Sequence, residues 1–250
     1  MIHRRTDISH IPAGDTGLPP PDMMTNYMLA GGTVRAAILG STILVNVARN
    51  AHNYGILESL IMGHAYTAAL LLGSDMKGNE RLVIQVDCSG PAKGYSVESN
   101  AAGEVRGYLK VNAIQINEPP TSFDTAAYME TGFLHITKYL ANEAEPYTGT
   151  VVLKYGTLAQ DLAWYYLTSE QIPSAFHLSV KFDRQGRVTG AGGLALHAMP
   201  GAEEETVRRL TAQLALLPSL GDLFEEGMVP DEAFRLFFQD FGIIKVSEKP

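Results

Sequence analysis

Residues 57–74 read LESLIMGHAYTAALLLGS, and this stretch decides the fold. Its apolar residues surround nearly the whole circumference of a helix instead of forming one face. Such a helix is stable only when other layers of the protein cover it on all sides. Glu58 and His64 interrupt the apolar run, which is shorter than the roughly 20 residues of a membrane span, so we expect a buried core helix.

The rest of the chain up to residue 199 is rich in strand-forming segments separated by turns. Turns at Gly90-Pro91 and at 100–103 divide the region after the helix into antiparallel strands. Strands are expected at 33–40, 81–87, 93–98, 104–110, 132–140, 149–155, 174–182 and 187–199. The sequence therefore predicts an α+β protein with a layered β/α/β core and a buried central helix, followed by a helical C-terminal arm.

Three regions follow one another along the chain. Residues 1–22 are polar and rich in proline, which predicts a flexible N-terminal arm. Residues 23–201 form the expected core domain, and the chain changes character at Pro200-Gly201. Residues 202–250 contain only helical patterns and are expected to form a helical linker arm.

A few shorter elements are also expected within the core domain. Ser41 or Thr42 is expected to cap a helix over 42–52. Residues 157–167 are expected to form an amphipathic helix, and residues 117–131 a loop.

The composition narrows the function classes. The formal net charge is −8 with an isoelectric point of about 5.3, and no cluster of Lys or Arg offsets it, which argues against binding to nucleic acid. Only 18% of residues are charged, below the roughly 25% of an average domain, so exposed apolar area is plausible. No apolar stretch follows the basic residues at the N-terminus, as a secretion signal would require. We expect a cytoplasmic protein without a membrane partner.

The residues that could take part in catalysis or metal binding are better explained by structural roles. Cys88 is the only cysteine, so the chain has no internal disulfide and no cysteine-based zinc site. Because Asp87 would disfavour its thiolate, we expect Cys88 to be a packing residue. His64 is expected to be a core histidine that is hydrogen-bonded to backbone. These observations predict no catalytic residue, no metal and no cofactor, and therefore a protein that is not an enzyme.

Residues 190–195, GAGGLA, fit the dinucleotide-binding pattern GxGxxA only nominally. The pattern needs a strand before it and a helix after it. Here the following residues alternate like a strand, so a β-bulge or close backbone packing is favoured.

Several segments together resemble the heat-shock protein 33 family of cytoplasmic, redox-regulated holdase chaperones of the stress response. The match spans most of residues 26–245. It consists of GTVRAAILGST at 32–42, AYTAALLLGSDMKGNERLVIQ at 65–85, SGP at 89–91, GEVRGYLK at 103–110, GTVVLKYGTLAQDLAWYYLTSEQIPSAF at 149–176 and GRVTGAGGLALHAMPGA at 186–202. The resemblance implies a core with a buried helix between sheet layers, and a helical linker after it.

The resemblance also implies a form of control that this sequence does not carry. Beyond the linker, members of the family have a zinc domain with CxC and CxxC motifs, and this sequence stops at Pro250, about where that domain would begin. None of the four ligands has a counterpart, so the zinc and disulfide roles pass to no residue. A truncated form and a natural member without the switch both remain open.

From this resemblance we expect an ATP-independent holdase that binds unfolded polypeptides, forms a homodimer when active and lacks the redox switch. The arm is expected to dock on the core as a lid and to bind clients when it loosens. The expected client-binding residues are Leu210, Leu214, Phe234, Phe237, Phe238 and Phe241, the last four spaced three or four apart on one helix. Two alternatives remain: a partner-specific interaction module, and an enzyme that has reused the core.

Overall fold

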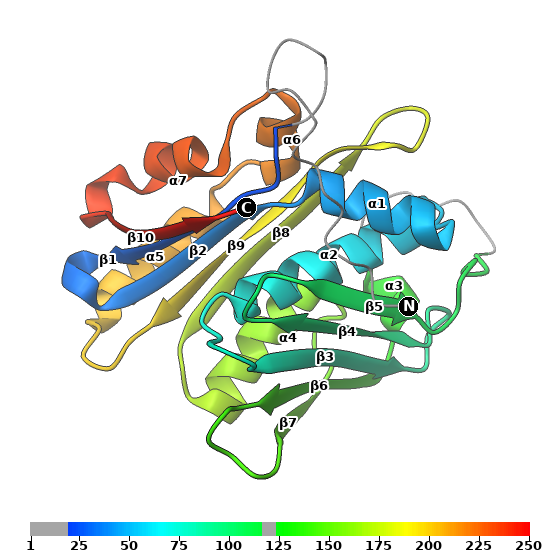
Figure 1. The fold of residues 1–250 in the computed structure, drawn as a ribbon, viewed down its shortest axis with the longest axis horizontal. Helices are drawn as coiled ribbons and strands as arrows, with labels where there is room; N and C mark the ends of the chain where they lie inside the picture. The colour runs from blue at the N-terminus through cyan, green and yellow to red at the C-terminus, as the bar shows by residue number, and fades with distance from the viewer. Residues whose placement is uncertain (1–19, 117–123) are drawn as a thin grey trace.

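The computed structural model describes residues 20–116 and 124–250, and two antiparallel sheets with a helix between them dominate it (Figure 1). The first sheet has the order β10 (Ile244–Lys249), β1 (Met24–Leu29), β2 (Val34–Gly40), β9 (Val188–Ala198) and β8 (Ser174–Phe182). The second has the order β5 (Val105–Leu109), β4 (Gly94–Asn100), β3 (Arg81–Cys88), β6 (Gly132–Tyr139) and β7 (Tyr147–Val152). The predicted α+β class and β/α/β layering are confirmed.

The central helix α2 (Ile56–Gly73) fills the space between the sheets. It contacts β3, β4 and β5 on one side and β8 and β9 on the other, and 16 of its 18 residues are buried. By length and composition alone α2 could cross a membrane, so our expectation that the run is too short was wrong. However, 83% of the apolar stretch is buried inside the protein, so α2 serves as a core helix.

Several polar side chains in and around α2 have internal partners. The carboxylate of Glu58 accepts a hydrogen bond of 2.6 Å from the Ile114 amide. Ser99 on β4 donates to the carbonyl of Ala69 at 2.6 Å. Burial, with a smaller contribution from nearby His177, lowers the pKa of His64 to about 4, so its imidazole is neutral at pH 7. This fits the expected core histidine, while its bond to backbone stays a prediction.

Asp22, and not Ser41 or Thr42, caps the helix α1 (Thr42–His52). Its two carboxylate oxygens accept hydrogen bonds from the amides of Ile43 at 3.0 Å and Leu44 at 2.7 Å, whereas the side chain of Ser41 makes no capping bond. Burial raises the pKa of Asp22 to about 6. Residues 1–19 of the expected flexible arm lie outside the described residues, but the end of that segment is fixed by this cap.

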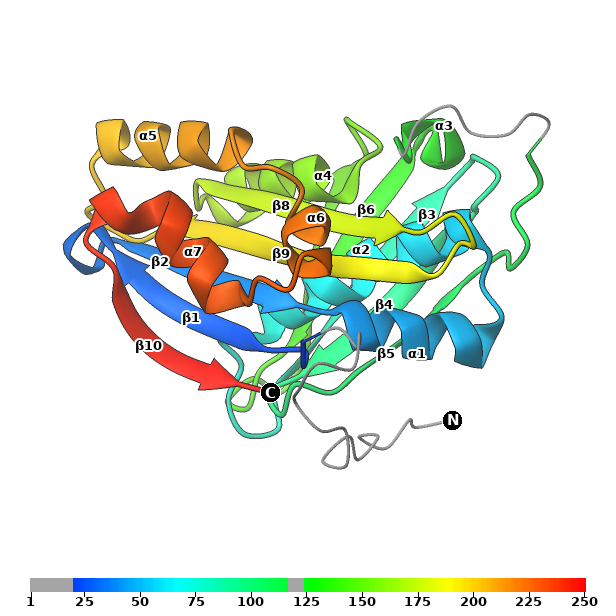
Figure 2. The ribbon, with the colours of Figure 1, turned by 90° about the horizontal axis from the view of Figure 1, so that it is seen from above.

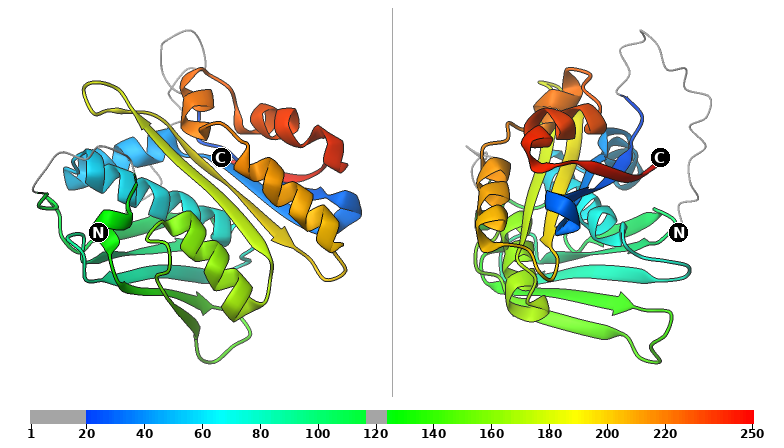
Figure 3. Two further views of the ribbon diagram at one scale, coloured as in Figure 1. Left: turned by 180° about the vertical axis from the view of Figure 1, so that it is seen from behind. Right: turned by 90° about the vertical axis from the view of Figure 1, so that its left-hand side faces the viewer.

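The remaining helices lie either beside α2 in the space between the sheets or on the outer face of the first sheet. α4 (Leu158–Tyr165), with the turn Tyr166–Glu170 after it, packs beside β8. Residues 117–123 of the expected loop lie outside the described residues, and the following part contains the unpredicted short helix α3 (Ala126–Met129). The arm helices α5 (Glu204–Ala215), α6 (Leu220–Glu225) and α7 (Pro230–Phe238) lie across the outer face of the first sheet, opposite α2 (Figures 2 and 3).

The arm does not stay helical to its end. The 3-10 turn Gln239–Phe241 is followed by Gly242, whose φ of 62° lies in the left-handed region that commonly ends a helix. The chain then reverses and forms β10, which pairs antiparallel with β1. The helical expectation for 202–250 is therefore wrong for Ile244–Lys249, and β1 itself was also not anticipated.

Candidate functional site

The apolar side of the C-terminal arm (residues 202–250) lies against the outer face of the first sheet. Phe234 and Phe238 are completely buried, Leu210 and Leu214 are nearly so, and Phe237 and Phe241 are partly buried. All six predicted client-binding residues belong to one cluster with residues of the sheet, which are Tyr27, Leu29, Val34, Ala36, Ile38, Ala175, Leu194 and Leu196. The structure thus brings the predicted residues together, in a docked and covered state.

A stack of aromatic rings joins α7 to β1. The ring of Phe234 lies parallel to that of Tyr27 with 4.0 Å between centroids. Phe238 stacks on Phe234 at 4.8 Å, and Phe241 follows at 6.1 Å from Phe238. Such pairs contribute about 0.5–1.5 kcal/mol each beyond the area they bury. The stack therefore anchors the last helix of the arm to the strand next to the sheet edge.

The glycines of β9 allow α6 to pack closely against the sheet. A Cβ atom at Gly190 would collide with the carbonyl oxygen of Gly221 in α6. One at Gly192 would collide with the ring of Phe224, also in α6, and with the carbonyl of Leu39. The predicted close backbone packing is confirmed, and a register shift next to Gly190 leaves Thr189 of β9 as a bulge opposite Lys181 and Phe182.

Polar contacts hold α6 at the same place. The hydroxyls of Ser179 and Ser219 are 2.7 Å apart, and the Gly221 amide donates to Ser179 at 3.0 Å. Lys181 on β8 forms ion pairs with Asp222 at 2.6 Å and with Glu225 at 2.7 Å. Both acids lie on the exposed side of α6, so these pairs brace the outside of an apolar contact.

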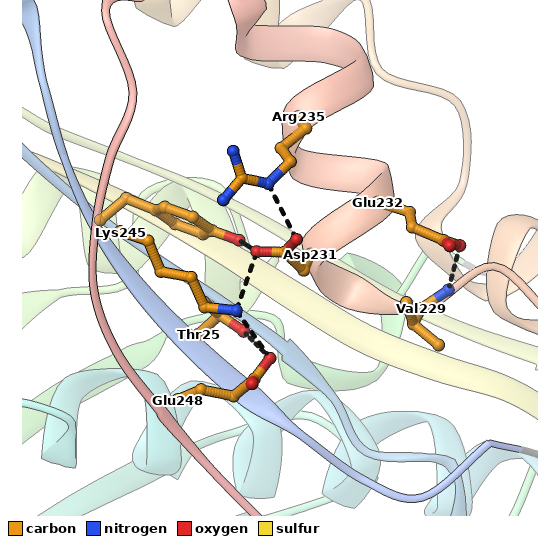
Figure 4. Close-up of polar contacts among 8 residues, drawn as sticks. Thr25, Val229, Asp231, Glu232, Arg235, Lys245 and Glu248 are labelled. Atoms are coloured by element: carbon orange, nitrogen blue, oxygen red, sulfur yellow. Dashed lines mark hydrogen bonds and ion pairs between the residues drawn. The ribbon is translucent and has the colours of Figure 1, made fainter.

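Asp231 connects three elements at the other end of the arm. Its carboxylate accepts hydrogen bonds from Tyr27 Oη on β1 at 2.5 Å and from Arg235 Nε on α7 at 2.8 Å, and Lys245 Nζ on β10 lies 3.2 Å away (Figure 4). Burial by itself would raise the pKa of Asp231, but these partners outweigh it and lower that pKa to about 2. Asp231 is therefore ionised at neutral pH and connects α7 to both β1 and β10.

The sequence gives no indication of this polar hub, which consists of Asp231, Tyr27, Arg235 and Lys245. Tyr27 and Asp231 are separated by 204 positions, and nothing in the local pattern of either residue indicates the other. A pairing of β10 with β1 would have been the necessary clue, and neither strand was predicted.

An apolar cavity of about 260 Å³ lies where α1, β2, α2 and the β4–β5 hairpin meet, away from the docked face of the arm. Its apolar lining includes Met24, Leu39, Ile43, Leu44 and Val105, and Lys249 and Pro250 contribute to its wall. The end of β10 therefore takes part in two surfaces, the sheet edge and this cavity. The sequence analysis did not anticipate the cavity.

The described residues show no constellation with obvious reaction chemistry. In residues 20–116 and 124–250, no three His, Cys, Asp or Glu side chains gather where they could hold a metal ion. Burial raises the pKa of the Cys88 thiol, whose Sγ lies 3.8 Å from Met129 Sδ, as expected of a packing residue. Asp87 was expected to disfavour the Cys88 thiolate, but its carboxylate forms an ion pair with Lys110.

Comparison with known proteins gives a consistent family. Residues 22–250 match the family model described as Hsp33 protein. The 33 kDa chaperonin of Desulforamulus reducens is 39% identical over 215 residues, which cover 86% of this chain and 73% of the relative. The 33 kDa chaperonin of Syntrophotalea carbinolica is 34% identical over 230 residues, covering 92% and 80%.

A solved structure agrees with the sequence matches. The crystal structure of the 33 kDa chaperonin (heat shock protein 33 homolog) from Thermotoga maritima superimposes with a TM-score of 0.79 at 29% identity, covering 91% of this chain and 77% of that one. The layered core, the arm docked on its outer face and the match over residues 22–250 lead to one conclusion. This chain belongs to the Hsp33 family of chaperones.

Proposed function

We propose that this chain is a holdase-type chaperone that binds unfolded or aggregation-prone polypeptides without ATP and without a redox switch. The observation that carries the proposal is the one-sided burial of the arm. Only Leu210 and Leu214 are buried among the 12 residues of α5, whereas the face they belong to continues into the aromatic stack of α7. An element attached by one face can leave without unfolding the core.

Opening of the arm would uncover two apolar surfaces at once. One is the face of the arm itself, with the six predicted client-binding residues, and the other is the outer face of the first sheet, including Ile38 and Leu196. Burial of apolar area is non-directional and tolerates many sequences. Both surfaces therefore suit unfolded polypeptides, which share exposed apolar side chains and little else.

The thiol content of this chain supports the proposed absence of redox control. Cys88 is the single cysteine, it lies in β3 of the second sheet, and burial raises the pKa of its thiol. A disulfide switch in this chain would need a second cysteine, and reaction with peroxide needs an accessible thiolate. We therefore propose that the arm opens by thermal fluctuation.

The test is light scattering of a chemically unfolded client protein diluted into buffer with this chain, once with reductant and once with peroxide. Equal suppression of aggregation in both conditions is the expected result. Suppression only after peroxide would contradict the missing redox control. No suppression in either condition, together with capture of a single tight partner in a pull-down, would favour a partner-specific interaction module instead.

A further inference from the structure

The strand β10 is attached to the first sheet by its backbone more than by its side chains. It is the outermost strand and pairs only with β1. Of its six residues only Ser247 is even partly buried, and its two largest apolar side chains, Ile244 and Val246, are 56% and 60% exposed. The ladder to β1 is therefore its main attachment, and backbone pairing accepts almost any sequence.

The side-chain contacts that assist this ladder are few and polar. Asn26 donates to Ser247 Oγ at 3.0 Å, Thr25 donates to Glu248 at 3.4 Å, and Lys245 reaches Asp231. Polar contacts near the surface contribute little to stability. A strand held in this way belongs to the part of a structure that opens first.

Removal of β10 would leave β1 as an unprotected edge. Its amides and carbonyls facing outward would then be unpaired, which is a template for another extended chain. The register from Met24 to Asn26, opposite Lys249 to Ser247, is uninterrupted, whereas a bulge follows between Asn26 and Tyr27. The regular part of the template is thus Met24–Asn26.

We infer that the β1 edge is a strand-addition site for an extended segment of an unfolded polypeptide, and that β10 occupies this site in the closed state. The inference rests on the proposed function and specifies how a client is held, namely by antiparallel backbone pairing with β1. Alternate side chains of an added strand point to the two faces of the sheet. One set would therefore meet the outer apolar face that α7 covers, around Tyr27 and Leu29.

Asp231 links release of the edge to release of the apolar face. Its carboxylate binds Lys245 of β10, Arg235 of α7 and Tyr27 of β1. Detachment of β10 removes the cation that approaches from the edge and so weakens the hub that also holds α7. The backbone template and the apolar surface would become available together.

The test uses the full chain in three forms and a fluorescent peptide with the sequence of residues 243–249, IIKVSEK. In the opened form, Ser247→Pro and Glu248→Pro are combined, because neighbouring amides point to opposite sides of the strand and one of the two faces β1. In the locked form, Asn26→Cys and Ser247→Cys, facing each other across the ladder, are joined as a disulfide in a Cys88→Ala background. The same protein after reduction is its matched control, and Thr25→Cys with Glu248→Cys is a second pair.

The opened form is expected to bind the peptide at least tenfold more tightly than the reduced control, because in the control β10 competes from within the chain. The locked form is expected to bind none. Two further peptides, N-methylated at Ser247 or at Glu248, separate backbone pairing from apolar contact. Neighbouring amides point to opposite sides of a strand, so only one methylation should abolish binding.

Equal peptide binding by the locked and reduced forms, or equal loss with both methylated peptides, would overturn the inference. Aggregation suppression by the same three proteins separates this outcome from the proposed function. If the opened form suppresses aggregation but binds no peptide, strand addition is wrong while the holdase function stands. If the opened form binds the peptide and suppresses nothing, the edge accepts strands and the holdase function is wrong.

Discussion

The central helix α2 and the arm helices α5–α7 pack on opposite faces of the same sheet, yet they are buried to very different extents. In α2, 16 of 18 residues are buried. In α5 the number is 2 of 12, and in α7 it is 4 of 9. A helix covered on both sides cannot leave without opening the core, whereas a helix covered on one side can. The same sheet therefore supports one permanent layer and one removable layer.

The polar groups of the two layers also differ in how deeply they are buried. Around α2 several are satisfied inside the protein, as with Glu58 and the Ile114 amide, although the buried Ser59 hydroxyl has no partner. In the arm, Asp222 and Asp231 lie at the margin of the apolar contact, where water can replace a lost partner. Detachment of the arm leaves few buried polar groups unpaired, while displacement of α2 would leave several.

The largest effect is expected from Phe234→Ala in α7. The completely buried ring stacks on Tyr27, and truncation of a buried Phe costs about 3–5 kcal/mol. Because the cost falls on docking of the arm, amide hydrogen exchange should accelerate in residues 204–249 and stay unchanged in α2. Leu236→Ala, in the same helix but 54% exposed, is the matched control and should change little. Equal acceleration in α2 would show that the arm and the core are one cooperative unit.

A smaller loss of about 2–5 kcal/mol is expected from Leu71→Ala in α2, but it should be global. Leu71 is 1% exposed between the two sheets. Urea denaturation should show a lower midpoint, and exchange should accelerate in both sheets as well as in the arm. Leu216→Ala, at a leucine that is 78% exposed, serves as the control. An effect confined to α2 and its neighbours would contradict the permanent layer.

The smallest effect concerns acid. The pKa of Asp231 is lowered from its usual 3.8 to about 2 in the folded protein, so its stabilisation of the arm is present above pH 4 and is lost as the pH falls through 2. The contribution is about 1–2 kcal/mol, since the side chain is 25% exposed and partly screened. Exchange in α7 and β10 should accelerate between pH 4 and 2 in the natural chain, and Asp231→Asn should remove that dependence. An identical pH dependence in both proteins would exclude Asp231 as the link.

The sequence predicted the permanent layer better than the removable one. The all-round apolar pattern of α2 and the turns of the meander are local signals, and they were sufficient for the layered core. The glycines at 190–193 were also correctly related to close packing. By contrast, β10 pairs with β1 across more than 200 residues, and Asp22 caps a helix that begins 20 residues later. Such long-range contacts leave no periodic trace in either segment.

The candidate site was also predicted only in part: its helix face was identified, but its partners in the fold were not. Spacings of three and four placed Phe234, Phe237, Phe238 and Phe241 near one another, and all four lie in or against the docked cluster. The pattern could not show that Tyr27 is the ring beneath Phe234, or that Asp231 joins α7 to β1 and β10. Periodicity identifies the face of a helix, whereas its partner is decided by the tertiary fold.

Hydrogen exchange followed by mass spectrometry on the unmodified chain, at several low concentrations of denaturant, tests the central claim most directly. The account predicts that amides of α5, α6, α7 and β10 exchange through an opening of lower free energy and weaker denaturant dependence than amides of α2. The same opening free energy and the same denaturant dependence in the arm and in α2 would contradict a removable arm.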